Sequence, residues 1–172
     1  RQGKASVVTD HIDHFTEHGI LLKSGKELEA DMVVTATGLN LQMFGGMAVT
    51  VDGKAIEIGK TMNYKGAMFR DVPNLAMTFG YTNASWTLKA DLTSEFVCRL
   101  LNTMDKKGLK QCTPRNSDPS VVEESFLNLA SGYIQRAAAK LPKQGNKSPW
   151  KLYQNYALDM AMLRFGSVDD GV

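Results

Sequence analysis

The sequence predicts an α/β protein, because extended stretches, hairpin turns and a strongly periodic helix follow one another along a globular composition. Two extended stretches, 30–40 (ADMVVTATGLN) and 73–80 (PNLAMTFG), each end at or near a glycine that no hairpin signal follows. The second stretch leads through a polar and aromatic turn into the best helical pattern of the chain. Strand, glycine and helix in this order are typical of open α/β sheets.

Residues 5–40 have the pattern of β-structure, with extended runs ASVVTDHIDHF, GILLK and ELEADMVVTAT. A Ser24-Gly25 pair separates the second run from the third and predicts a hairpin. A second hairpin is predicted over 47–58, because Asp52-Gly53 supplies the positive-φ residues of a type I′ turn. The β-branched residues that alternate around this turn are Val49, Val51, Ile56 and Ile58.

A long amphipathic helix is predicted to follow the stretch 73–80. Its apolar stripe consists of Leu88, Leu92, Phe96, Leu100 and Met104, widened by Val97 and Leu101. Asp91 and Glu95 lie near its start and Lys106 and Lys107 near its end, as the helix dipole favours. Gly108 stands where a left-handed C-cap is expected.

The last third of the chain predicts a loop and two short helices. Residues 112–124 (CTPRNSDPSVVEE) are polar and contain two prolines, which favours a loop or linker. The stretch 131–142 (SGYIQRAAAKLP) predicts a helix that Pro142 ends, and 155–166 (NYALDMAMLRFG) predicts another that ends near Gly166.

Composition excludes several classes of function. The chain has 172 residues, of which 43% are hydrophobic and 22% charged, and its net charge of +2 is too small and scattered to indicate binding of nucleic acid or a membrane surface. No apolar run is long enough to predict a transmembrane segment and no leader pattern opens the chain. Two cysteines, Cys98 and Cys112, without metal or C-x-x-C spacing fit a reducing compartment, so we expect a cytoplasmic protein.

Three histidines, His11, His14 and His18, have a spacing that would align them on one face of a helix. Three imidazoles could bind zinc, but the neighbouring residues favour extended structure and no carboxylate pattern supports the site. We therefore predict no metal site.

Gly38 and Gly80 are candidate site residues, although most glycines at strand ends only permit a turn. Ligands of open α/β sheets bind beyond the carboxyl ends of strands, where a helix N-terminus presents unpaired N–H groups. The stretch after Gly80 (YTNASWT) fits that arrangement, but Asn83, Ser85 and Thr87 could equally be helix N-caps. Trp86 needs a partner surface, which a flat cofactor or the protein core could supply.

Two longer stretches carry a resemblance to a known family. DMVVTATG, over 31–38, resembles the A-T-G segment that links the nicotinamide and flavin domains of flavin-containing and Baeyer–Villiger monooxygenases, the class B flavoprotein monooxygenases. VPNLAMTFGYTNASWTLKADLTSEFVCRLLN, over 72–102, is similar to the flavin-domain return strand and helix of that group. LQMFGG, MNYKGAMF and LPKQGNKSPWKLYQNY fit the subfamily of the ethionamide-activating mycobacterial enzyme, so the likeness covers almost the whole chain.

The resemblance implies an enzyme with FAD and NADPH sites. Such an enzyme forms a C4a-peroxyflavin with O2 and inserts one oxygen atom into a ketone or a sulfur or nitrogen centre of a small molecule. It also implies that Thr37 and Gly38 lie at the domain junction and that the N-terminus of the helix lies near the flavin pyrimidine edge, where it favours the anionic reduced flavin. The residues that would border the cofactor after the second strand are Gly80, Tyr81, Thr82, Asn83, Trp86, Thr87 and Leu88.

Departures from the family pattern limit this reading to a C-terminal portion. Two G-x-G-x-x-G loops and an F-x-G-x-x-x-H fingerprint are missing from the sequence, so the catalytic residues are not assigned and should lie upstream. We expect the end of an NADPH-binding domain over 1–40, the closing part of an FAD-binding domain over 41–111 and a C-terminal loop and helical extension over 112–172. The expected fold is thus an α/β fragment with β-hairpins, a parallel-sheet return strand and C-terminal helices, which is inactive alone.

Two alternatives stay open from the sequence. A disulfide reductase has the same two-dinucleotide architecture, although no closely spaced cysteine pair is present. A non-catalytic interaction domain would be favoured if no phosphate loops were encoded upstream. In a fragment that lacks the upstream halves of its sheets, strand edges and the stripe through Leu88, Leu92 and Phe96 are expected to be exposed, which favours self-association of this chain.

Overall fold

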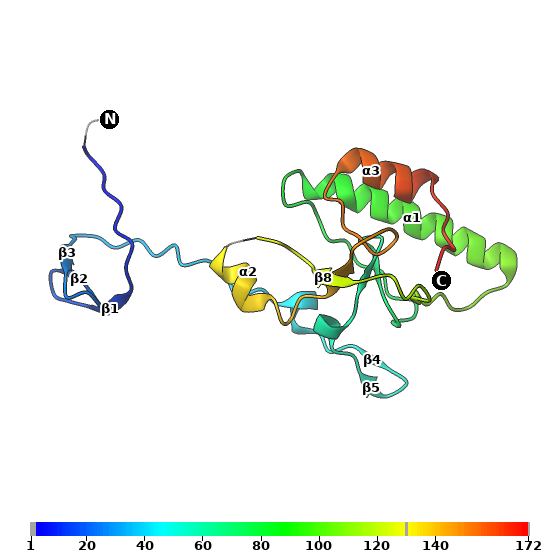
Figure 1. The fold of residues 1–172 in the computed structure, drawn as a ribbon, viewed down its shortest axis with the longest axis horizontal. Coiled ribbons are helices and arrows are strands. Elements are labelled where there is room, and N and C mark those ends of the chain that lie inside the picture. Colours follow the sequence, from blue (N-terminus) through cyan, green and yellow to red (C-terminus); the bar gives the residue numbers. More distant parts are fainter. Residues whose placement is uncertain (1–2, 130, 172) are drawn as a thin grey trace. The chain divides into compact units, whose positions relative to one another are not determined.

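The computed structural model describes residues 3–129 and 131–171, and the chain divides into two compact units, 1–38 and 39–172 (Figure 1). The first unit contains strands β1 (Ile12–Phe15), β2 (Gly19–Leu22) and β3 (Glu27–Glu29), which form an antiparallel sheet in that order. The Ser24-Gly25 hairpin is confirmed, because Gly25 has φ +84° and its N–H donates to the Leu22 carbonyl at 2.9 Å.

The two stretches expected as strands that end at glycines are not strands. Residues 31–38 are exposed and have no ladder partner among the described residues, and Gly38 has φ +85°. The stretch 73–80 donates two backbone hydrogen bonds, from the Asn74 N–H to the Cys112 carbonyl at 2.9 Å and from the Met77 N–H to the Ala67 carbonyl at 2.8 Å. A strand needs a regular ladder of such bonds to a neighbouring strand, and neither stretch has one among the described residues.

The second unit contains three short antiparallel strand pairs. The Asp52-Gly53 hairpin is confirmed, since φ is +50° and +76° at these residues between β4 (Thr50–Val51) and β5 (Lys54–Ala55). The other two strand pairs are β6 (Asn63–Tyr64) with β7 (Met68–Phe69) and β8 (Glu123–Ser125) with β9 (Lys143–Gly145). The same unit contains the 3-10 helices η1 (Met43–Gly46) and η2 (Ile58–Lys60). The segment from Cys112 to β8 is irregular, as its prolines predicted.

Helix α1 (Trp86–Lys107) agrees with the predicted long helix and its C-cap. Gly108 has φ +66°, and its N–H donates to the Asp105 carbonyl at 3.1 Å. Leu92, Phe96 and Leu100 of the predicted stripe are buried, but Leu101 is 53% exposed, so its assignment to the stripe is wrong. Lys89 and Thr93 are buried in its place.

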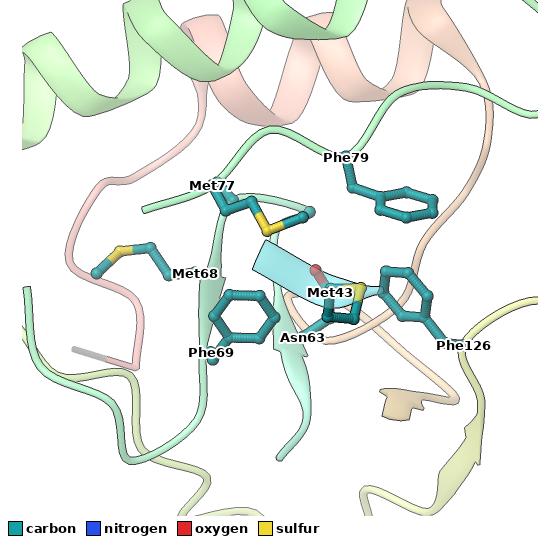
Figure 2. A pocket seen from close by; sticks show the side chains of 9 residues that line it. Met43, Asn63, Met68, Phe69, Met77, Phe79 and Phe126 are labelled. Carbon is teal, nitrogen blue, oxygen red and sulfur yellow. The ribbon is translucent and has the colours of Figure 1, made fainter. Parts of the chain in front are cut away.

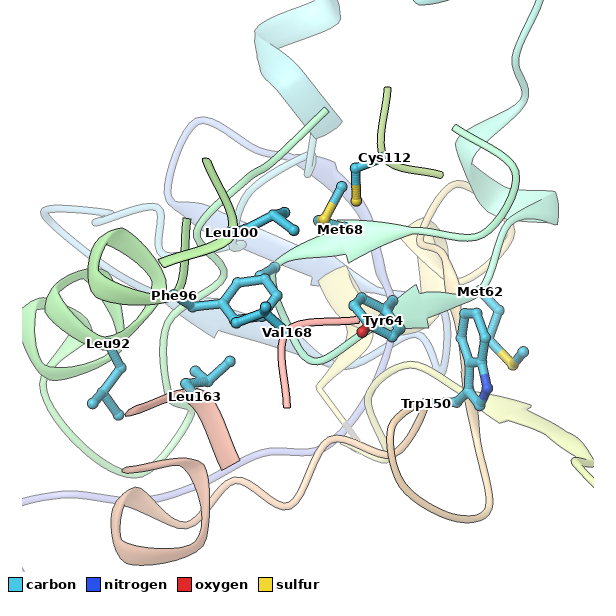
Figure 3. Packing of buried hydrophobic residues seen from close by; sticks show 11 residues of the cluster. Met62, Tyr64, Met68, Leu92, Phe96, Leu100, Cys112, Trp150, Leu163 and Val168 are labelled. Carbon is cyan, nitrogen blue, oxygen red and sulfur yellow. The ribbon is translucent and has the colours of Figure 1, made fainter. Parts of the chain in front are cut away.

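Helix α2 (Gly132–Ala137) confirms the first predicted C-terminal helix, but the expected end at Pro142 is wrong, because the helix ends at Ala137. Helix α3 (Tyr156–Met160) and the π-helix η3 (Ala161–Phe165) confirm the second, which ends at Gly166. Helices α3 and η3 pack along α1 (Figure 1). Phe96 and Leu92 therefore lie in a core with Leu163 and Tyr64 (Figure 3). The expectation that Leu92 and Phe96 are exposed in this chain is wrong, because its own C-terminal segment covers them.

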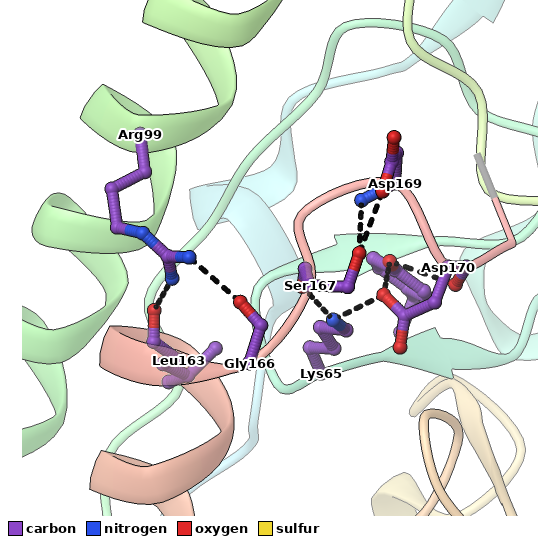
Figure 4. A network of polar contacts seen from close by, with 8 residues as sticks. Lys65, Arg99, Leu163, Gly166, Ser167, Asp169 and Asp170 are labelled. Atoms are coloured by element: carbon purple, nitrogen blue, oxygen red, sulfur yellow. Dashed lines mark hydrogen bonds and ion pairs between the residues drawn. The ribbon is translucent and has the colours of Figure 1, made fainter.

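Polar contacts fix this C-terminal segment in place (Figure 4). The fully buried Lys65 donates from Nζ to the Ser167 carbonyl at 2.6 Å and pairs with Asp170. Arg99 donates to the Leu163 and Gly166 carbonyls at 2.6 and 2.7 Å. The end of η3 is thus fastened to both α1 and the β6–β7 turn.

Two further findings concern the described part of the chain. Within 3–129 and 131–171, no group of three His, Cys, Asp or Glu side chains could hold a metal ion, and His14 lies in strand β1. Over the same residues, no helix has both the length and the apolar character that crossing a membrane requires.

Candidate functional site

An apolar groove of about 400 Å³ runs along the second unit beside the turn that precedes α1. Its walls come from residues around η1, from 77–86 and from the segment 127–141. The residues that line it are Leu41, Gln42, Met43, Phe44, Met77, Phe79, Tyr81, Thr82, Trp86, Leu127, Leu129, Tyr133, Ile134 and Leu141. Three of the predicted site residues, Tyr81, Thr82 and Trp86, therefore share one groove.

The floor beside this groove is nearly closed. Beside the groove lies a cavity of only about 10 Å³. Figure 2 shows side chains that line this cavity, among them Met43, Met77, Phe79 and Phe126. The Phe79 and Phe126 rings meet edge to face at 4.7 Å between centroids. That space does not exceed one water molecule, so a ligand beside this turn would lie in the open groove and not in the small cavity.

Trp86 finds its partner surface within the turn itself. A Cβ atom added to Gly80 would lie 2.1 Å from Cγ and Cδ2 of the Trp86 indole, and the Phe79 ring centroid is 5.5 Å from that of Trp86. Gly80 is therefore needed to make room for the indole, since its φ does not lie in the left-handed region. The outer part of the indole, with Trp86 58% exposed, still faces the groove and solvent.

Tyr81 is buried, and its hydroxyl lies near the Asp159 carboxylate. Burial raises the pKa of this phenol, and the nearby Asp159 carboxylate raises it further. Nζ of Lys89 lies 5.8 Å from the Tyr81 ring centroid and 3.0 Å from Asp159 Oδ2, and both charged residues are buried. Burial lowers the pKa of Lys89, although Asp159 opposes that shift.

Thr82 and Asn83 are held from the C-terminal segment. The Thr82 N–H and hydroxyl donate to Gln154 Oε1 at 2.8 and 3.2 Å, and Asn83 Nδ2 donates to the Gln154 carbonyl at 3.3 Å. Both residues are otherwise exposed. Their polar groups therefore fix the shape of the turn.

The N-terminus of α1 carries no side-chain cap. Ser85 is the N-cap residue, but its hydroxyl is bonded to the Thr87 hydroxyl at 2.7 Å and accepts no hydrogen bond from the first-turn amides. Thr87 and Leu88 are exposed beside it. Those amides and the positive end of the helix dipole are suited to an electron-rich group.

The remaining predicted residues, Thr37 and Gly38, are exposed at the end of the first unit. Sequence reasoning missed Lys89, Gln154 and Asp159, and also the groove wall over 127–141. Only Lys89 left a usable signal, because it lies three and seven positions before Leu92 and Phe96, on the buried side of α1.

Comparison with curated proteins relates the whole chain to one class, the flavoprotein monooxygenases. It is 54% identical over 170 residues to the FAD-containing monooxygenase EthA of Mycobacterium tuberculosis (strain H37Rv) and 51% identical over 173 residues to the probable FAD-binding monooxygenase AlmA of Acinetobacter baylyi. It is 48% identical over 171 residues to the putative FAD-containing monooxygenase MymA of M. tuberculosis (strain H37Rv).

These alignments cover 99 to 100% of this chain but only 34 to 35% of each relative, so the chain spans about a third of their length. No protein-family model and no solved structure matches the chain. The resemblance to the flavoprotein monooxygenases, and to the ethionamide-activating subfamily among them, is confirmed.

Proposed function

We propose that this chain is the C-terminal part of a cytoplasmic, NADPH-dependent flavoprotein monooxygenase that inserts one atom of O2 into a ketone or a sulfur or nitrogen centre. The proposal rests on one observation: about half of the residues over nearly the whole chain are identical to those of relatives whose names describe FAD-containing or FAD-binding monooxygenases. In this proposal, residues 1–40 end the NADPH-binding domain, 41–111 close the FAD-binding domain and 112–172 form an extension. The longer protein supplies the dinucleotide loops.

The residues present fit one end of a flavin. The uncapped first turn of α1 offers N–H donors to an electron-rich edge, and the groove beside it offers apolar walls to a flat ring. When bound, the flavin would supply the redox chemistry with NADPH and O2.

Each part of the site has a separate task in this proposal. The first-turn amides of α1 bind and stabilise negative charge at the cofactor edge. Phe79 and the exposed face of Trp86 exclude water from one side of the groove. Thr82 and Asn83 orient the turn through Gln154 and do not face the cofactor with free polar groups.

The test is purification of the full-length protein in which this sequence lies. We expect one FAD per polypeptide, and consumption of NADPH and O2 that rises when a ketone or thioether is added. Substrate screening separates insertion of oxygen into a ketone from oxidation at a sulfur centre. A full-length protein without flavin would refute the proposal, and a coding sequence without upstream G-x-G-x-x-G loops would favour the non-catalytic interaction domain.

A further inference from the structure

The turn that leads into α1 is held from the C-terminal segment at two points. The first point is Gln154, whose side chain accepts from the Thr82 N–H at 2.8 Å and whose carbonyl accepts from Asn83 at 3.3 Å. Gln154 has φ +51°, a conformation that non-glycine residues adopt only at a cost in free energy. The hydrogen bonds of Gln154 to the turn can compensate for the cost of this backbone conformation.

The second point is the ion pair between Lys89 Nζ and Asp159 Oδ2 at 3.0 Å. Both residues are at most 3% exposed, and burying two charges costs desolvation that their attraction only partly returns. Such a pair is therefore weak evidence for stability, but it fixes the relative position of two helices strongly. Here it ties the first turns of α1 and α3 together, with the Tyr81 ring 5.8 Å from the ammonium.

We propose that Gln154 and Asp159 form a clasp that positions the turn Gly80–Lys89 for the flavin, so that both are positioning residues of the monooxygenase. This inference rests on the proposed function. Neither residue lines the groove, so each acts through its partner: Gln154 through Thr82, and Asp159 through Lys89. Both residues of the clasp belong to the C-terminal extension, so this segment would help to position the cofactor site.

The experiment uses the full-length protein, FAD as the probe, and three variants. Gln154→Ala removes the side-chain bonds to Thr82 at a half-buried site and keeps the backbone carbonyl that accepts from Asn83. Lys89→Met with Asp159→Leu removes both buried charges together. Asn155→Ala is the matched control, because it removes the N-cap bond from the Leu158 N–H at 3.2 Å and touches no residue of the turn through that side chain. Readouts are the FAD dissociation constant, the visible circular dichroism of bound flavin and the unfolding midpoint.

We expect Gln154→Ala and the double variant to raise the FAD dissociation constant about tenfold or more, and to change the flavin dichroism, as small misplacements of a site do. Asn155→Ala should lower the unfolding midpoint slightly, because it removes one helix cap, while flavin binding stays unchanged.

Wild-type flavin affinity in Gln154→Ala would overturn the clasp even if the double variant fails to fold. Equal loss of flavin in Asn155→Ala would also overturn it, because general loosening of α3 would then suffice. Absence of FAD from the wild-type protein would overturn the proposed function itself and the clasp with it. FAD in the wild type with unchanged affinity in the variants would overturn the clasp alone.

Discussion

A methyl group added at Gly80 would collide with Trp86, and this collision makes a quantitative prediction. The added Cβ would lie 2.1 Å from the indole carbons, whereas ordinary contact begins at 3.4 Å, so the ring must retreat by the difference of 1.3 Å. Overpacking of this kind costs about 1–3 kcal/mol, and the Phe79–Trp86 ring contact, worth about 0.5–1.5 kcal/mol, would be disturbed as well. We expect Gly80→Ala to cost about 2–3 kcal/mol in the free energy of unfolding.

The assay is a double-mutant cycle by urea unfolding with Gly80→Ala, Trp86→Ala and both. In the Trp86→Ala background the added methyl group meets no indole, so Gly80→Ala should then cost less than about 0.5 kcal/mol. The coupling between the two positions should therefore be about 2 kcal/mol. Additive effects of the two substitutions would refute the packing argument.

The same pair of positions separates packing from cofactor binding. Gly80→Val in the full-length protein should lose FAD, because the bulkier side chain drives the indole into the groove. Trp86→Phe keeps most of the apolar area and should retain FAD. A folded Gly80→Val protein with full flavin content would show that this turn does not hold the cofactor.

Three further predictions follow. The 172-residue chain alone should be colourless, since the dinucleotide loops are missing from its sequence, and a flavin absorption band that survives gel filtration would contradict this. It should self-associate through the unpaired extended segments of the first unit, where Val7 is 94% and Met32 82% exposed; a monodisperse monomer by light scattering that binds no apolar dye would count against it. Asp170→Ala should lower the free energy of unfolding by about 3–5 kcal/mol, because it leaves the buried Lys65 ammonium without its ion-pair partner. Lys65→Met should lower it less, since the half-exposed Asp170 carboxylate can be hydrated. Urea unfolding that shows the reverse order would reject this reasoning.

The parts of the fold that could be predicted are those that neighbouring residues determine. The turns at Ser24-Gly25 and Asp52-Gly53 and the cap at Gly108 need only the conformational freedom of glycine and its neighbour. The stretches 31–38 and 73–80 were predicted as strands and are not, because a strand also needs a partner. Burial of Phe96 under the C-terminal segment could not be predicted either, since it depends on contacts such as Lys65 with Asp170, which lie 105 positions apart.

The features of the candidate site likewise divide into those that the sequence indicated and those that it did not. The sequence indicated that Trp86 needs a partner surface, and the structure supplies it with Gly80 and Phe79 from the same short stretch. Asp159 gave no pattern, because alone it looks like an ordinary surface charge, and only the packing of α3 on α1 makes it a buried partner of Lys89. Since the indole already accounts for Gly80, a missing side chain at that position is no argument for a cofactor by itself. The argument for flavin in this groove depends instead on the first-turn amides of α1, which no N-cap side chain satisfies, and on the apolar walls beside them.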